Sequence, residues 1–135
     1  MDKRKNFAKL FYWLFFFWLV SIVVISSLPK LSDPDIEWLS DFQIRLDYLF
    51  HFGAFALLAL FWCISYFLKN GDYSLKKRVR FFLLLMVFAA LDEAHQIFIP
   101  GRSFNPIDLL FNELGLSVSI FGWPIIEKYF KKWWC

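Results

Sequence analysis

Four apolar runs, each close to the length of a membrane-spanning helix, constrain this chain more than any other feature. The first run extends from Phe7 to Leu28 and contains one charged residue, Lys9. The other three cover residues 49–68, 80–99 and 107–126. A helix needs about 20 apolar residues to cross the hydrocarbon core of a bilayer. The sequence therefore predicts an all-α membrane protein, a bundle of four transmembrane helices.

The amino-acid composition agrees with a membrane protein. Hydrophobic residues make up 59% of the chain, and 19 Phe and 7 Trp far exceed what one soluble core of this size requires. A length of 135 residues predicts a single membrane domain over residues 1–135 and no separate soluble domain. A cleaved signal peptide is the alternative for the first run. That run is long and aromatic, so an uncleaved helix is favoured.

The distribution of Lys and Arg predicts the orientation of the chain. Of the 15 basic residues, 12 lie before or near the start of the first run, in the loop after the second, or in the C-terminal tail. Three basic residues, Lys30, Arg45 and Arg102, lie in the other two loops. The positive-inside rule then places both the N and C termini in the cytoplasm. Because topology accounts for the basic residues, no nucleic-acid partner is expected.

The segment between the first two runs is acidic and allows two interpretations. Pro29 stops the first helix, and Ser32 or Asp33 can cap a new helix that has Pro34 at an early position. Apolar residues then recur at helical spacing, which predicts a short surface helix between spans one and two. An ordinary loop is the alternative.

A polar stretch from Leu91 to Asn112 interrupts the apolar sequence at the outer ends of spans three and four. His51 begins span two on the same side. Polar and charged groups in such surroundings are costly, so they need partners or a function. We predict a polar pocket in the outer half of the membrane. Its residues are His51, Asp92, Glu93, Gln96, Arg102, Asp108 and Asn112.

Helical spacing predicts which of these residues share a face of span three. Asp92, His95 and Gln96 are related as i, i+3 and i+4, so they are expected on one face. Pro100-Gly101 then breaks the helix and predicts a tight turn.

Span four carries a matching polar stripe. Asn105 is the expected N-cap of this span, with Pro106 as its first residue. Asp108 and Asn112 are four residues apart, and Gly115 continues the stripe and would allow close helix approach. Since a short turn joins spans three and four, their polar faces should oppose one another.

The chemistry of the cluster leaves several roles open. Arg102 could form bidentate contacts with Asp92 or Asp108, or it could bind an anionic group from outside. Catalytic candidates are His51, Asp92 and Glu93, because imidazole exchanges protons near neutral pH and carboxylates act as general acids and bases. The alternative is that the cluster only joins helices. Interhelical hydrogen bonds average about 0.6 kcal/mol in membranes, so a pocket is favoured.

Metal binding is not expected from the sequence. His51, His95, Asp92 and Glu93 could in principle act as ligands. However, their spacing is not H-E-x-x-H, and the two cysteines, Cys63 and Cys135, form no ligand motif. No metal and no cofactor are therefore predicted.

The polar residues form a pattern that resembles a known family. The pattern reads Asp47-x-x-x-His51-Phe52-x-x-Phe55, Asp92-Glu93-x-x-Gln96, Pro100-Gly101-Arg102 and Asp108-x-x-x-Asn112-x-x-Gly115. It is similar to the VanZ-like family of small bacterial membrane proteins, and the similarity extends from about Asp47 to Gly122. His95 and Glu113 fall at variable positions of the pattern. Tyr48 departs from it, since a Lys often precedes the His there.

The resemblance implies a multi-pass protein of the bacterial cell membrane with a role in the cell envelope. The family is named for a member linked to resistance to teicoplanin, a lipoglycopeptide antibiotic. An outward pocket would meet membrane lipid, lipid-linked cell-wall precursors or lipoglycopeptides. Three functions stay open: binding such a ligand, acting as an intramembrane enzyme on a lipid or lipid phosphate, and a structural or proton-relay role.

Overall fold

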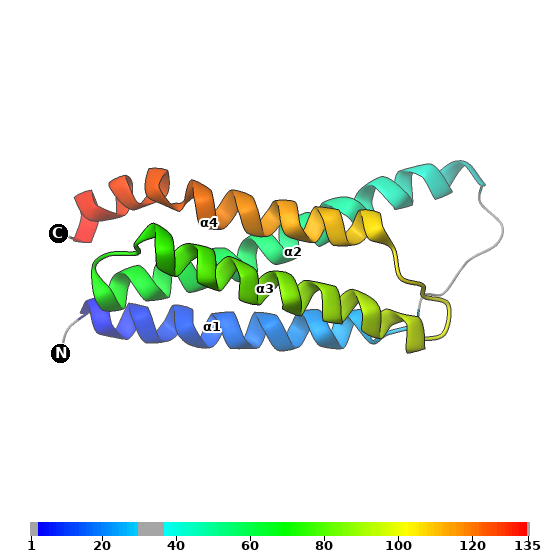
Figure 1. The fold of residues 1–135 in the computed structure, drawn as a ribbon, viewed down its shortest axis with the longest axis horizontal. Coiled ribbons are helices and arrows are strands. Elements are labelled where there is room, and N and C mark those ends of the chain that lie inside the picture. The colour runs from blue at the N-terminus through cyan, green and yellow to red at the C-terminus, as the bar shows by residue number, and fades with distance from the viewer. Residues whose placement is uncertain (1–2, 30–36, 135) are drawn as a thin grey trace.

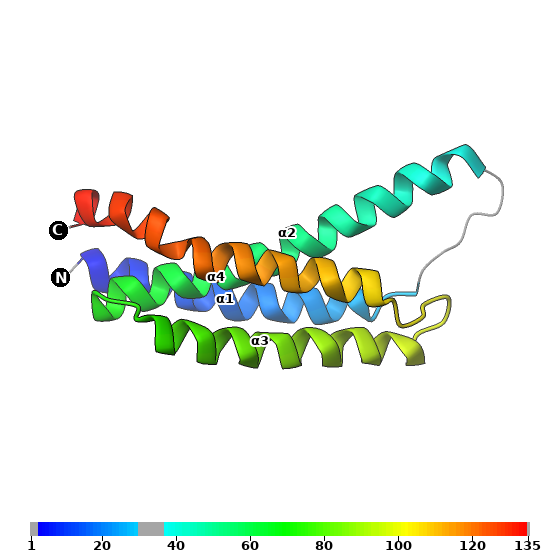
Figure 2. The same cartoon turned by 45° about the horizontal axis from the view of Figure 1, so that its top comes forward.

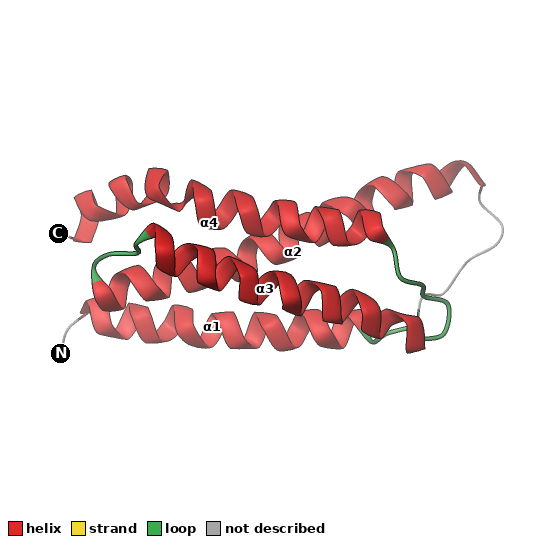
Figure 3. Ribbon diagram, in the orientation of Figure 1, coloured by secondary structure: helices red, strands yellow, loops and turns green. Residues whose placement is uncertain are grey.

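The computed structural model describes residues 3–29 and 37–134, with side chains at 3–29 and 46–132, and it is all-helical over that part of the chain (Figure 3). Its elements are α1 (Lys3–Ser26), α2 (Glu37–Asn70), α3 (Leu75–His95), the short 3₁₀ helix η1 (Gln96–Phe98) and α4 (Pro106–Trp134). The predicted all-α fold is confirmed.

The four long helices form one elongated bundle. The first residues of α1 and the last residues of α4 lie at the same end (Figure 1). We call the other end, where α1 and α3 end and α4 begins, the distal end. Helix α2 packs against both α1 and α4, and α3 packs mainly against α4. The N-terminal part of α2 diverges from the other helices at the distal end (Figure 2).

Each of the four long helices is long and apolar enough to cross a membrane. Their outer faces carry large apolar side chains, such as Trp13, which is 68% exposed, and Phe17, which is 69% exposed. Such a surface is unfavourable in water and favourable against lipid chains. The fold is therefore that of a multi-pass membrane protein, as predicted.

Aromatic side chains fill much of the space between the helices. Trp62 of α2 stacks on Phe81 of α3 with ring centroids 4.4 Å apart, and Phe15 of α1 lies 5.2 Å from Trp62. On the opposite side of α2, Phe67 contacts Trp123 of α4 at 5.8 Å. These pairs join all four helices, since aromatic rings supply large contact areas with preferred geometry.

Helices α2 and α4 approach each other much more closely. A Cβ at Gly115 would overlap the backbone carbonyl of Phe52, so only glycine allows this approach. One turn further along α4, Ser119 Oγ donates to the carbonyl oxygen of Ala56 at 2.7 Å. The polar stripe of span four thus faces α2. The prediction that it opposes the polar face of span three is wrong, because glycine brings α4 against α2 instead.

The helices extend beyond the predicted spans. Residues 37–70 form one helix, so the part of the predicted surface helix that the structure describes is continuous with span two. The proposed cap at Ser32 or Asp33 lies outside the described residues. Helix α3 begins at Leu75, ahead of the apolar run. Helix α4 continues through Pro124 to Trp134, and it bends in its C-terminal part (Figure 2).

Candidate functional site

The turn at the distal end follows the local sequence closely. Gly101 has a φ of 75°, and the amide of Arg102 donates to the carbonyl of Ile99 at 3.1 Å. A proline followed by a glycine at positive φ is the typical composition of such a turn. Asn105 then caps α4, since its Oδ1 accepts from the amide of Ile107 at 3.0 Å. The predicted turn and cap are both confirmed.

Glu93 connects the end of α3 to the start of α4. Its side chain is fully buried. Oε1 accepts from the backbone amide of Asn105 at 2.9 Å, and Oε2 accepts from Gln96 Nε2 at 3.3 Å. A buried carboxylate requires such donors to offset its loss of hydration. Glu93 thus fixes the loop between the two helices through these two hydrogen bonds.

Arg102 binds the end of α1. Its Nε donates to the carbonyl of Leu28 at 2.8 Å, its Nη2 to that of Ile25 at 3.3 Å, and its Nη1 to Gln96 Oε1 at 3.1 Å. The final carbonyls of a helix lack intrahelical partners and attract a cation. Within the described part of the chain, Arg102 forms no ion pair with Asp92 or Asp108, so the first of its two predicted roles is wrong. The second, binding an anionic group from outside, stays a prediction.

Asp92 is held by α1 as well. Its carboxylate is buried, and Oδ1 accepts from the hydroxyl of Ser26 at 2.6 Å. His95, which was expected on the same face, is exposed instead. The α-helix ends at His95 and the chain tightens into η1, which turns Gln96 inward and leaves His95 outside.

These contacts make up one unit, which joins the ends of α1 and α3 to the start of α4. We call it the linker network. It consists of Ser26, Asp92, Glu93, Gln96, Arg102 and Asn105.

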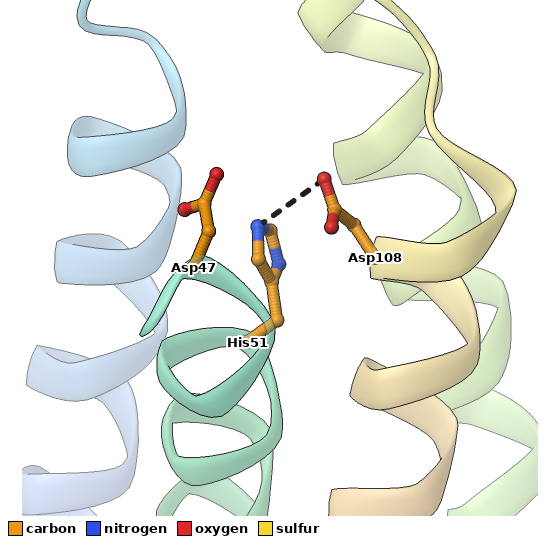
Figure 4. A group of neighbouring side chains, drawn as sticks. All are labelled: Asp47, His51 and Asp108. Carbon is orange, nitrogen blue, oxygen red and sulfur yellow. Dashed lines mark ion pairs between the residues drawn. The ribbon is translucent and has the colours of Figure 1, made fainter. Parts of the chain in front are cut away.

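A second polar unit lies between α2 and α4 (Figure 4). His51 Nδ1 lies 3.0 Å from Asn112 Oδ1, and His51 Nε2 lies 3.7 Å from Asp108 Oδ2. Asp47 lies one turn before His51 on α2, and its side chain lies beside the same imidazole (Figure 4). We call Asp47, His51, Asp108 and Asn112 the His51 group. Its ligand atoms on Asp47, His51 and Asp108 all lie within 4.8 Å of one another.

A pocket of about 630 Å³ lies between α1, α2 and the end of α3. Most of its wall is apolar, with Trp18 and Ile22 on one side and Phe50 and Phe55 on the other. Both polar units contribute to its surface. Their pocket-lining residues are Ser26, Asp47, His51, Asp92, Gln96 and Arg102. The volume falls in the range of pockets that hold small molecules.

The structure divides the seven predicted pocket residues into two sets. His51, Asp92, Gln96 and Arg102 line the pocket. Glu93, Asp108 and Asn112 lie behind them and hold Gln96 or His51 in place.

Of the polar residues in the two units, sequence reasoning left Asp47 and Ser26 out of the pocket. Asp47 carried a signal, because it lies four residues before His51 on the same helix face. Ser26 carried none, since a lone Ser at the end of an apolar run is common.

The site combines an apolar wall with polar side chains, which suits an amphiphilic molecule. Its imidazole can accept and donate protons, and its carboxylates can bind cations or donors. Arg102 and Gln96 still line the pocket, although their main contacts are within the protein.

Fold and site together define a class: a four-span membrane protein with a polar cluster and a mixed pocket at one end of the bundle. The chain belongs to the VanZ/LLP1 family, whose family model matches residues 7–127. Comparison with curated proteins and with solved structures finds no match. The family assignment confirms the resemblance inferred from the polar motifs.

Proposed function

We propose that the pocket faces outward in a bacterial cell membrane and binds an amphiphilic ligand of the outer leaflet. The ligand class is a lipid-linked cell-wall precursor or a lipoglycopeptide. Binding would lower the action of teicoplanin at the cell surface. The observation that carries the proposal is the pocket of about 630 Å³, which offers apolar side chains along α1 and α2 and polar ones at its distal end.

The position of the pocket supports this class of ligand. Its apolar wall lies among membrane-spanning residues such as Trp18 and Phe55, where an acyl or isoprenoid chain would lie. Its polar residues lie toward the distal end of the bundle, where a headgroup would be. The basic residues concentrate at the other end of the bundle, which supports an outward distal end.

Two glycines provide a matched test of the proposal. A Cβ at Gly53 or at Gly122 would meet no heavy atom within 4 Å, but only Gly53 lines the pocket. Gly53→Leu should occupy part of the pocket, and Gly122→Leu should add the same side chain outside it. We expect Gly53→Leu cells to become as susceptible to teicoplanin as cells without the protein, at equal expression, whereas Gly122→Leu cells keep wild-type susceptibility.

A second measurement addresses binding directly. Native mass spectrometry of the full-length protein released from membranes should detect a bound lipid-linked species in wild type and in Gly122→Leu, but not in Gly53→Leu. If deletion of the protein leaves susceptibility unchanged and no bound species is detected in wild type, the proposal fails.

An intramembrane enzyme acting on a lipid or lipid phosphate is the second candidate. The observation that favours it is His51, which lines the pocket and faces a carboxylate of α4. Lipid extracts of cells that lack or overproduce the protein should then differ in one lipid species, and His51→Gln should abolish the difference. Identical lipid profiles would exclude catalysis while leaving binding intact.

A further inference from the structure

We propose that an anionic phospholipid binds at the end of the bundle opposite the distal end, with its phosphate at Lys69 and its acyl chains along α1. We call this end, where α1 begins and α2 ends, the proximal end (Figure 1). The inference does not depend on the proposed function, because its site is a second pocket that shares no lining residue with the first.

The second pocket lies between α1 and the end of α2 and has a volume of about 170 Å³. Its lining consists of three aromatic and three polar residues: Tyr12, Trp62, Tyr66, Ser65, Lys69 and Asn70. Aromatic rings beside a lysine are typical of a protein surface at the level of lipid headgroups. Pockets that enclose a whole small molecule begin at about 300 Å³. This smaller one suits the part of a lipid where the headgroup joins the chains, with the chains lying outside it.

A surface for the acyl chains continues from the pocket along α1. Tyr12 is 43% exposed, and its ring lies 4.9 Å from that of Phe16, which is 39% exposed and one turn further from the proximal end. Both residues belong to a helix that is long and apolar enough to cross a membrane. An acyl chain along these rings would therefore bury apolar surface that the pocket alone does not cover.

Two basic segments meet at this pocket. Arg4 Nε donates to the carbonyl of Leu68 at 2.8 Å, and Ser65 Oγ donates to the carbonyl of Ala8 at 2.9 Å, so the start of α1 lies against the end of α2. Residues 3–9 contain four basic residues and no acid, and residues 69–80 contain five basic residues and one acid. Basic clusters between helices at a membrane surface attract anionic lipid headgroups.

Lys69 and Lys77 are the cations expected to contact the phosphate. Lys69 lines the pocket, and its side chain is exposed. Lys77 Nζ lies 5.4 Å from the ring centroid of Tyr66, which also lines the pocket. An ammonium group has three N–H donors, so a contact with an aromatic face leaves donors for an acceptor oxygen. The pocket thus has one cation in its lining and a second on a ring of that lining, and a phosphate can accept from both.

The alternative is that these lysines only set the orientation of the chain, which requires no bound lipid. In that case all exposed lysines of the proximal end should be equivalent. Lys132 provides the comparison for Lys69, because it is exposed near the end of α4 and does not line the pocket. Tyr129 provides the comparison for Tyr12, because it is 68% exposed and also lies outside the pocket.

The test uses the full-length protein, stripped of lipid in detergent and titrated with lipid in native mass spectrometry. Phosphatidylglycerol should bind roughly tenfold more tightly than phosphatidylcholine, which carries the same chains but no net charge. Lys69→Gln should weaken binding of phosphatidylglycerol about fivefold, as expected for one lysine at an anionic surface, whereas Lys69→Arg and Lys132→Gln should keep it within about twofold of wild type. Tyr12→Ala should weaken binding of both lipids, and Tyr129→Ala should weaken neither.

A photoactivatable phosphatidylglycerol locates the site in wild-type protein, so this measurement does not require any variant to fold. In nanodiscs, its crosslinks should fall within residues 5–16 and 62–70, and soluble glycerol 3-phosphate should not prevent them. Equal affinity for the two lipids, equal losses in Lys69→Gln and Lys132→Gln, or crosslinks confined to other segments would each overturn the proposal. Competition by glycerol 3-phosphate would show a site for a free phosphate compound instead of a lipid. A dimer that forms through Tyr12 and excludes the lipid would likewise contradict it.

Discussion

The linker network and the His51 group lie at the same end of the bundle, yet they use polar side chains differently. In the linker network, Glu93 and Arg102 bind backbone groups: the amide of Asn105 and the carbonyls of Ile25 and Leu28. In the His51 group, the contacts of His51 run to the side chains of Asn112 and Asp108. Backbone groups at helix ends are present in every sequence and need hydrogen-bond partners when they are buried. A polar side-chain pair between two helices is different, because apolar side chains could take its place.

The difference supports a structural role for the linker network and agrees with the functional role proposed for the pocket that His51 lines. The linker network satisfies helix ends that would otherwise be costly in an apolar environment. The contacts of His51 join side chains of α2 and α4, and its contact to Asp108 is longer than a hydrogen bond. Charged groups kept in a membrane protein without such a structural need indicate function. Both units meet at the pocket, so the structural unit also positions the wall of the functional one.

The largest effect should follow from separating the two helices that carry the His51 group. Gly115→Ala places a Cβ against the backbone of Phe52 and Ala56, which cannot rotate away. We expect the free energy of unfolding to fall by about 2–3 kcal/mol. Gly122→Ala is the control, because no heavy atom lies within 4 Å of its Cβ. Equilibrium unfolding in mixed micelles measures both, and equal stability of the two variants would contradict the close contact.

A somewhat smaller loss of stability should follow from breaking the linker network. Glu93→Leu removes the acceptor of the Asn105 amide and the partner of Gln96. We expect the free energy of unfolding to fall by about 2 kcal/mol, because the amide of Asn105 is left without its acceptor. Hydrogen exchange of that amide should increase along with the loss of stability. A Glu93→Leu protein as stable as wild type, with the Asn105 amide still protected, would show that the network is not structural.

Local signals in the sequence predicted much of the fold. The four spans follow from apolar length, the distal turn from Pro100-Gly101, and the start of α4 from Asn105-Pro106. In each case the physical cause lies within a few residues of the feature: hydropathy over one helix, a glycine at positive φ, or a side chain capping its own helix. Such causes can be read from one sequence.

The errors concern partners that are distant in the chain. A contact of Arg102 with Asp92 or Asp108 was one of two roles considered for it, but Arg102 binds carbonyls of α1. Every residue possesses a carbonyl, so such a partner carries no sequence signal. Gly115 was expected to face α3 but faces α2. Residue spacing identifies a helix face that has a small residue, but it does not identify which helix packs against that face. The contribution of α1 to the pocket, through Trp18 and Ser26, depends on the same long-range packing.

The smallest effect on stability, with a large effect on function, is expected for His51→Gln. Its hydrogen bond to Asn112 is a side-chain contact between helices, a kind worth about 0.6 kcal/mol in membranes, and Gln can still donate to the same oxygen. The free energy of unfolding should therefore stay within about 1 kcal/mol of wild type. The proposed protection against teicoplanin should be lost, because Gln supplies no imidazole at the pocket. His95→Gln, an exposed control, should alter neither property. If His51→Gln destabilises the protein as much as Glu93→Leu, the two polar units do not differ, and the functional role of the His51 group must be abandoned.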